Sequence, residues 1–257
     1  MSKDWTKIRA KVKDFIENEI YPKENELSKG TQESREMLGS LMQLAKDEKI
    51  WALGHPEDIG GGGMPFMEYV YVNEVIGRSS FAMVALGTHS LQDSIMLREF
   101  ASPHWRDQYL EPLVQGEIFP SFGMTEPDVA SSDPTQLQTT AILDNGSWKI
   151  NGRKWFTTGA SRAAYTTVMC RTELDAPSHG AFSMIIVPTD NPGYKIIRET
   201  PVLGINGGHY EVEYDNVEVP EENLLGPRGQ GFIIAQKRLG PGRIFHCMRW
   251  LGQAQRA

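Results

Sequence analysis

Along residues 1–118, apolar residues recur at three- and four-residue steps, the spacing of one face of a helix. The first predicted helix carries this stripe on Trp5, Ile8, Val12, Phe15, Ile16 and Ile20. A second helix is predicted around residues 37–45. The run GHPEDIGGGGMP (54–65) then interrupts the pattern, because glycine disfavours helix. Further helices are predicted at 65–78, 80–100 and 103–116.

From about residue 119 the pattern changes to short segments typical of strands. The segments LQTTAIL (137–143) and SWKI (147–150) flank Asn145-Gly146, a pair that suits the positive φ angles of a tight hairpin. A second such pair, Asn151-Gly152, precedes RKWFTTG. Further strands are predicted at AAYTTVMCRT (163–172), AFSMIIVP (181–188) and HYEVEYDNVEVP (209–220), with turns at DNPG (190–193) and INGG (205–208). This part of the chain is predicted to form a β domain.

A helical pattern returns at residues 232–257 and continues to the last residue, Ala257, with no glycine cap or proline stop. Its apolar stripe, on Ile244, Cys247, Met248 and Leu251, needs a partner helix that the remaining sequence does not supply. We therefore expect the chain to be the N-terminal portion of a longer protein.

Composition and charge exclude several classes of function. The 257 residues carry a net charge of −7, which argues against a nucleic-acid binder, since such proteins normally present a basic face. The two cysteines and six histidines show no metal-ligand spacing. The amphipathic, charged N-terminus is unlike a signal peptide, and no segment approaches the ~20 apolar residues that a membrane span needs. A cytoplasmic location is the default expectation. The stretch PRGQG (227–231) follows no strand–helix unit, so it is not a phosphate-binding loop.

Several phrases, taken in order, resemble the acyl-CoA dehydrogenase family. They are PEDIGGGG (56–63), Thr125-Glu126-Pro127 with Ser131 in the small-residue run after it, Lys154-Trp155-Phe156-Thr157-Thr158-Gly159, DNVEVPEENLLG (215–226) and GQGF (229–232). Each phrase alone is a weak signal, but the collinear set covers essentially the whole chain. The words TEPDVASSD and LGPGRIFHCMR are most similar to the subgroup fused to kinase-like domains.

The resemblance implies an α+β fold. It has a helical N-terminal domain (1–118), a β-barrel-like middle domain (119–228) and the first helix of a truncated C-terminal helical bundle (229–257). It also implies FAD as cofactor and an acyl-CoA thioester as substrate. The β-hydrogen would move as hydride to the flavin, and electrons would pass to an electron-transferring flavoprotein. The full-length form is expected to be a homodimer or homotetramer, in the mitochondrial matrix if the source is eukaryotic.

The resemblance also assigns residues to the cofactor. Met124 and Thr125 would contact the flavin ring, and Ser131 the phosphate-bearing part of the flavin or the CoA. Trp155 and Thr157, two residues apart and hence on one face of a strand, would pack against the ring and hydrogen-bond near its hydride-accepting nitrogen. Hydroxyls and amides suit these contacts because they donate to ring carbonyls and phosphate oxygens without adding charge.

The substrate side is less complete in this sequence. Arg243 matches a family arginine near bound CoA, and the proline before it, Pro241, is expected at the start of the last helix. The catalytic base lies beyond Ala257 in most of the family, and in a minority just before this arginine, where this chain has Gly242. No catalytic carboxylate is therefore identified, and Glu126 is assigned to the turn rather than to acid–base chemistry.

Two other classes of function remain open. One keeps the fold but uses oxygen as acceptor, as in an acyl-CoA oxidase or a flavin monooxygenase relative. The other is a catalytically incomplete fragment that acts as a binding module. If the chain is a fragment, we expect it to hold FAD weakly and to catalyse poorly.

Overall fold

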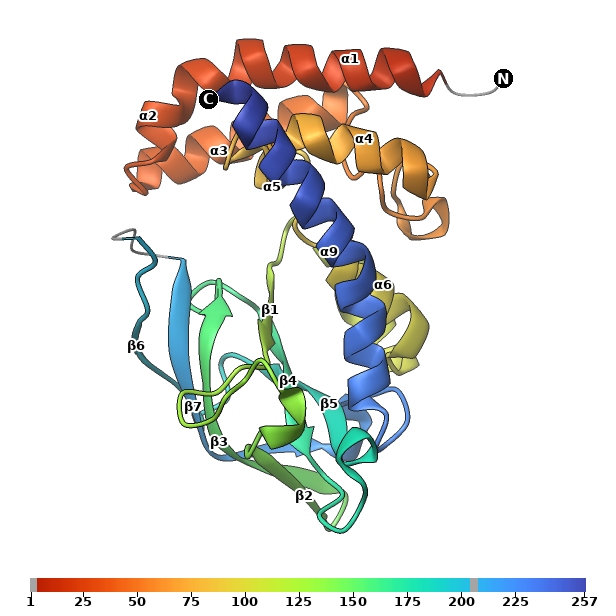
Figure 1. Cartoon of the computed structure of the whole chain (residues 1–257), viewed down its shortest axis with the longest axis vertical. Coiled ribbons are helices and arrows are strands. Elements are labelled where there is room, and N and C mark those ends of the chain that lie inside the picture. Colours follow the sequence, from red (N-terminus) through yellow and green to blue (C-terminus); the bar gives the residue numbers. More distant parts are fainter. Residues whose placement is uncertain (1–3, 204–207) are drawn as a thin grey trace. The chain divides into compact units, whose positions relative to one another are not determined.

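A computed structural model describes residues 4–203 and 208–257 and divides the chain into two compact units (Figure 1). The helical unit comprises the chain up to Ile95 together with Val114–Gly116 and Arg238–Ala257. The strand unit comprises Met96–Leu113 and Glu117–Lys237. The turn predicted at INGG falls largely on residues 204–207, which lie outside the described residues.

The helices α1, α3 and α4 lie where the apolar periodicity predicted them, and side-chain caps set the starts of α1 and α3. Asp4 accepts a hydrogen bond from the Lys7 amide at the start of α1, and Thr31 forms a capping box with Ser34 at the start of α3. The helices up to residue 100 are α1 (Trp5–Phe15) with a π-helical extension (Ile16–Ile20), α2 (Glu24–Leu27), α3 (Gln32–Asp47), α4 (Phe66–Ile76), α5 (Ala82–Ala85) and α6 (Leu91–Phe100). The helix predicted over 80–100 is therefore two helices, and the segment between them includes Gly87 at φ 68°.

Three further helical pieces follow in the strand unit or at its border. They are α7 (Pro103–Trp105), a π-helical turn (Arg106–Leu110) and α8 (Glu111–Gln115). The last helix, α9 (Gly231–Arg256), begins one residue before the predicted start and contains Pro241 in its interior. The expectation that Pro241 begins the helix is wrong, because the preceding ten residues are already helical.

Within the helical unit, α9 packs closely on α4 through glycines. A Cβ atom added at Gly252 would overlap the carbonyl oxygen of Glu74, and one added at Gly77 would overlap the backbone of Arg249. The stripe predicted to lack a partner is largely exposed, with Ile244 44% and Leu251 52% accessible. The buried face of α9 is a different one.

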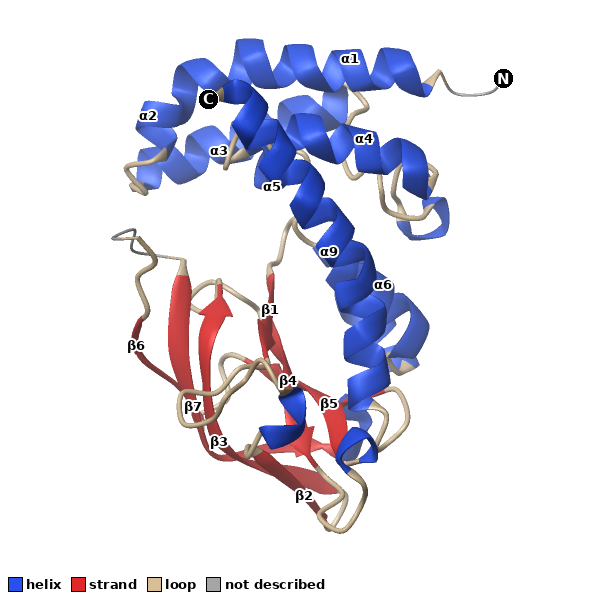
Figure 2. Ribbon diagram, in the orientation of Figure 1, coloured by secondary structure: helices blue, strands red, loops and turns tan. Residues whose placement is uncertain are grey.

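Among the residues that the structure describes, the strand unit is built on an eight-stranded mixed sheet, whose strands Figure 2 shows in red. The order is β6-β7-β3-β2-β4-β5-β8, with β1 pairing parallel to β4. The strands are β1 (Pro120–Gly123), β2 (Thr140–Asp144), β3 (Ser147–Thr158), β4 (Tyr165–Arg171), β5 (Phe182–Pro188), β6 (Tyr194–Glu199), β7 (His209–Pro220) and β8 (Leu224–Leu225). The predicted hairpin joins β2 to β3, with Asn145 and Gly146 both at positive φ.

The long pairing of β3 with β7 contains two irregularities. Ile150 pairs with Val217 and Gly152 with Tyr214, so β7 carries an extra residue there and Asn151-Gly152 does not interrupt β3. Further along, Lys154 pairs with Val212 and Thr157 with Tyr210, so here the extra residue lies on β3. Each bulge shifts the alternation of inward and outward side chains on its own strand.

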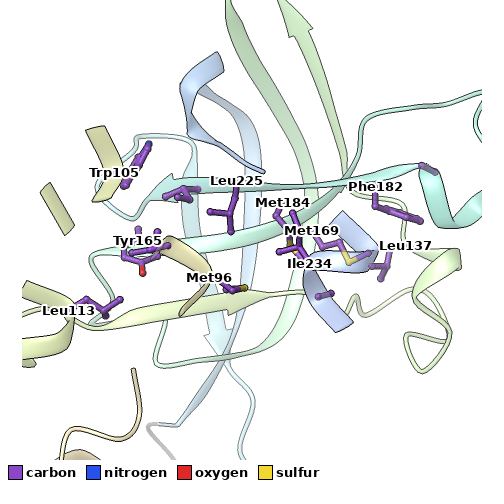
Figure 3. Packing of buried hydrophobic residues seen from close by; sticks show 14 residues of the cluster. Met96, Trp105, Leu113, Leu137, Tyr165, Met169, Phe182, Met184, Leu225 and Ile234 are labelled. Carbon is purple, nitrogen blue, oxygen red and sulfur yellow. The ribbon is translucent and has the colours of Figure 1, made fainter. Parts of the chain in front are cut away.

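Two hydrophobic clusters stabilise the strand unit. One packs side chains of α6, α7, α8 and α9 against β4, β5 and β8 (Figure 3), and includes Met96, Trp105, Tyr165, Phe182 and Ile234. The other lies among β2, β3, β4, β5 and β7, and includes Trp148, Ile150, Val168, Ile185 and Val212. Burial of Trp148 and Ile150 in the second cluster holds β3, the strand that carries the predicted cofactor residues Trp155 and Thr157, in place.

Candidate functional site

The loop at residues 124–131 is attached to β3 through the hydroxyl and the carbonyl oxygen of Thr125. The Thr125 hydroxyl donates to the carbonyl oxygen of Trp155 at 2.8 Å, and the Trp155 amide donates to the carbonyl oxygen of Thr125 at 3.0 Å. Three of the residues predicted to contact flavin, Met124, Thr125 and Trp155, are thereby brought together. All three side chains are half-buried, so each retains surface that a ligand can reach.

Glu126 attaches the same loop to β3 through a buried ion pair. Its carboxylate accepts from the Lys154 ammonium at 2.8 Å and from the Gln138 and Thr139 amides at 2.7 and 2.9 Å. Burial raises the pKa of the Glu126 carboxyl, but the Lys154 charge and these hydrogen bonds outweigh it, and the pKa is lowered. A carboxylate with this many donors is a structural anion, which agrees with its assignment to the turn.

Ser131 closes the loop on itself. Its hydroxyl accepts from the Glu126 amide at 2.8 Å and lies 3.0 Å from the Glu126 carbonyl oxygen, to which it donates. The side chain is half-buried, and a hydroxyl oxygen has a second lone pair. The serine is therefore engaged by the loop, and its predicted contact with phosphate remains a prediction.

The bulge on β3 determines which of its side chains point away from the protein interior. Phe156 has a φ of 50°, in the left-handed region, and its side chain is 44% exposed. Thr157 is 0% exposed, and its hydroxyl has no hydrogen-bond partner among the described residues. The argument that Trp155 and Thr157 share one strand face is wrong, because the extra residue between them turns Thr157 inward. Phe156 and Thr158 are the exposed pair.

The exposed side chains of β3 form a small aromatic and polar group. The Trp155 and Phe156 ring centroids are 4.9 Å apart, and the Thr158 hydroxyl lies 2.9 Å from Nδ1 of His209 on β7. When His209 carries its proton on Nδ1, this nitrogen donates a hydrogen bond to the Thr158 hydroxyl oxygen, which leaves the hydroxyl hydrogen available for another acceptor. Accessible aromatic rings beside a hydroxyl fit a flat ring system with polar edges, which is the shape of a flavin.

The predicted substrate residues lie on α9 in the helical unit. Arg243 is exposed, in the middle of the helix rather than near its start. Gly242 is buried, and a Cβ atom at this position would overlap the side-chain amide of Gln92. The absence of a side chain at Gly242 therefore allows α9 and Gln92 to lie close together. It supplies no acid or base.

Residues 4–203 and 208–257 contain no group of three or more His, Cys, Asp or Glu side chains placed to hold a metal ion. No helix within these residues combines the length and apolar character needed to cross a membrane.

Comparison with known proteins identifies the family. The model "Acyl-CoA dehydrogenase, N-terminal domain" matches residues 2–117, and "Acyl-CoA dehydrogenase, middle domain" matches residues 121–217. A structure described as an acyl-CoA dehydrogenase from Mycobacterium abscessus is 35% identical, with a TM-score of 0.91 over 99% of this chain and 68% of that one. The chain belongs to the acyl-CoA dehydrogenase family, as the ordered motifs predicted, and has its helical, sheet and helical order.

Curated relatives agree with this membership. The Mycobacterium tuberculosis protein "Probable acyl-CoA dehydrogenase FadE2" is 45% identical over 228 residues, which are 86% of this chain and 55% of that protein. "Acyl-CoA dehydrogenase family member 11" of Gallus gallus is 37% identical over 274 residues, covering all of this chain and 35% of that protein. The second relative belongs to the kinase-fused subgroup that the resemblance indicated. The chain thus spans between a third and a little over half of these relatives.

A further similar structure is described as an electron transferring flavoprotein of Acidaminococcus fermentans. It is 25% identical, with a TM-score of 0.82, and the match covers 98% of this chain and 65% of that one.

Reasoning from the sequence missed Lys154, Phe156 and Thr158. A signal for Lys154 was present, because it continues the even-numbered inward phase of Trp148 and Ile150, where a lysine needs a buried partner. No local signal marked Phe156 or Thr158, because the bulge that exposes them is set by the pairing of β3 with β7.

Proposed function

We propose that this chain forms the flavin-binding part of an enzyme that introduces a 2,3-double bond into an acyl-CoA thioester. Membership of the acyl-CoA dehydrogenase family supports the reaction class. The observation that carries the proposal within this structure is the loop at 124–131, fastened to β3 beside the exposed Phe156 and Thr158. FAD, when bound, supplies the acceptor for the hydride that leaves the β-carbon.

The protein's own residues bind and orient. We propose that Met124, Thr125 and Trp155 line the flavin ring and that Ser131 meets a phosphate of the flavin or of CoA. On β3 the structure favours Phe156 and Thr158 as the outward contacts, since Thr157 points into the sheet. Hydroxyl and backbone donors in this group can polarise ring carbonyls without fixing the charge of the flavin.

The proton on the α-carbon needs a carboxylate base, and Gly242 cannot be one. We propose that the base is supplied outside residues 1–257, and that Arg243 contributes to holding the CoA moiety. An enzyme assembled from this chain alone is then expected to bind acyl-CoA without rapid turnover.

A matched pair of isosteric substitutions tests the flavin site. Thr158→Val should raise the dissociation constant for FAD by about tenfold, the value of one hydrogen bond to a polar ring edge. Thr157→Val should leave FAD affinity within twofold, because its hydroxyl is buried without a partner in the described structure. Affinity is measured by titration of FAD fluorescence. The reverse ranking would restore Thr157 as the contact and refute the role proposed for Thr158. No FAD binding by the unmodified chain would refute the flavin site itself.

The electron acceptor is a separate proposal. Membership of the acyl-CoA dehydrogenase family supports a partner flavoprotein rather than oxygen as the acceptor. With the full-length enzyme reduced by acyl-CoA, stopped-flow reoxidation should be fast with electron-transferring flavoprotein and slow with air. Rapid reoxidation by air would favour the oxidase alternative. We also propose a homo-oligomer, which light scattering of the full-length protein tests.

A further inference from the structure

We infer that Lys154 is a positioning residue for the flavin loop, acting through Met124 and Glu126. The inference rests on the proposed function, because it assigns Lys154 a role in presenting residues 124–131 to FAD. Lys154 itself is fully buried beneath the sheet surface, so it does not touch a ligand.

The Lys154 ammonium joins two points of the loop. It donates to the carbonyl oxygen of Met124 at 2.9 Å and to the Glu126 carboxylate at 2.8 Å. The first bond directs a main-chain carbonyl inward, and so sets the orientation of the peptide unit between Met124 and Thr125. That peptide unit carries the Thr125 amide, which belongs to the residue proposed to contact the flavin ring.

Glu126 extends the same connection to the segment before β2. Its two carboxylate oxygens accept from the Gln138 and Thr139 amides, so the loop is attached to β3 on one side and to residues 138–139 on the other. The bond from the Thr125 hydroxyl to the Trp155 carbonyl oxygen and the bond from the Trp155 amide to the Thr125 carbonyl oxygen complete the attachment. Loss of the Lys154–Glu126 pair should free the loop at its centre while both flanking strands remain paired.

Stability alone gives a weak reason for such a pair. Lys154 and Glu126 are 0% and 5% exposed in their side chains, and desolvation of two buried charges largely cancels their attraction. An apolar pair of similar volume is often as stable. The geometry therefore indicates that the role of the pair is to orient the loop. An apolar pair cannot take this role, because it has no donor for the Met124 carbonyl.

The chain contains a control ion pair that also involves a β3 lysine but lies on the surface. Lys149 and Glu218 face each other across β3 and β7, with the ammonium 3.4 Å from the carboxylate and both side chains at least half exposed. The test compares Lys154→Met/Glu126→Leu with Lys149→Met/Glu218→Leu in the 257-residue chain. Three quantities are measured: the thermal midpoint, the dissociation constant for FAD, and hydrogen exchange of the Trp155 amide. That amide reports loop attachment because it bonds to the Thr125 carbonyl oxygen and not to either substituted side chain.

We expect the buried double variant to fold with a lower thermal midpoint, because it leaves the Met124 carbonyl and the Gln138 and Thr139 amides without these partners. Under native conditions Trp155 exchange and the FAD dissociation constant should each rise at least tenfold. The surface double variant should change neither. If the buried variant showed the same Trp155 exchange and the same FAD affinity as the unmodified chain, the inference would be overturned and the pair would be a packing feature only. If the buried variant does not fold, Glu126→Gln is measured in the same way. It should show the same direction of change, and an unchanged Trp155 exchange and affinity would overturn the inference.

The experiment separates this inference from the proposed function. An unmodified chain that binds no FAD would refute the flavin site, yet Trp155 exchange would still decide whether Lys154 orients the loop. An unmodified chain that binds FAD, together with a buried variant that binds it equally well, would refute the positioning role and leave the flavin site standing.

Discussion

Acid should destabilise the helical unit through one buried histidine. His55, in the glycine-rich segment, is 0% exposed, and its Nε2 lies 3.2 Å from the hydroxyl of the equally buried Ser90. Its carbonyl oxygen accepts from the Gly63 amide at 2.9 Å, and a Cβ atom at Gly61 would overlap its backbone. Because the side chain is fully buried, a proton on its ring has little access to water.

The size of the effect follows from the pKa. Burial lowers the pKa of His55 from 6.5 to about 4. The unfolded chain therefore binds this proton more readily than the folded one, so stability falls as pH falls through 6.5 and levels off below about 4. Each pKa unit corresponds to about 1.4 kcal/mol, which gives a total loss of about 3 kcal/mol, of which about 2 kcal/mol falls between pH 7 and pH 5.

Urea unfolding at pH 7 and pH 5, followed by tryptophan fluorescence, measures this loss. The His55→Gln variant has no titrating ring, so its free energy of unfolding should fall about 2 kcal/mol less than that of the unmodified chain over this interval. His104→Gln removes an exposed histidine and should behave like the unmodified chain. An equal loss in His55→Gln and the unmodified chain would refute the reasoning. The carboxylates do not affect the comparison, because they are the same in all three chains. The stabilisation from Glu126, whose pKa is lowered, is lost only below the ordinary value of 4.5.

Two other features of the structure make separate predictions. Gly252→Ala should lower the free energy of unfolding by about 1–3 kcal/mol, because its methyl group would overlap the Glu74 carbonyl oxygen at the α4–α9 contact. Gly240→Ala, in the same helix with no atom within 4 Å of the added carbon, should instead stabilise by up to about 1 kcal/mol; equal effects in urea unfolding would contradict the packing argument. In the native chain a thiol reagent should modify exposed Cys247 rapidly and Cys170 only on unfolding, since burial raises the pKa of the Cys170 thiol to about 12. Two rapidly reacting thiols would show that the sheet interior is open.

Much of the fold could be predicted because its signals are local. The Asn145-Gly146 hairpin and the buried strand over residues 182–188 lie where their residues predict them. The strand β6 was missed because it is an edge strand with five consecutive exposed residues after Tyr194, so it shows no alternation. The interior position of Pro241 was missed because proline more often begins a helix than continues one.

The sequence by itself determined the family and the order of helical and β segments, since these follow from ordered motifs and local periodicity. Only the tertiary structure decided which side chains of β3 face outward. The bulge opposite Tyr210 and Val212 inserts one residue, and one residue is enough to exchange the two faces of a strand. That exchange buries Thr157 and exposes Phe156 and Thr158. The pairing of Lys154 with Glu126 likewise depends on contacts 28 residues apart in sequence, which no local pattern specifies.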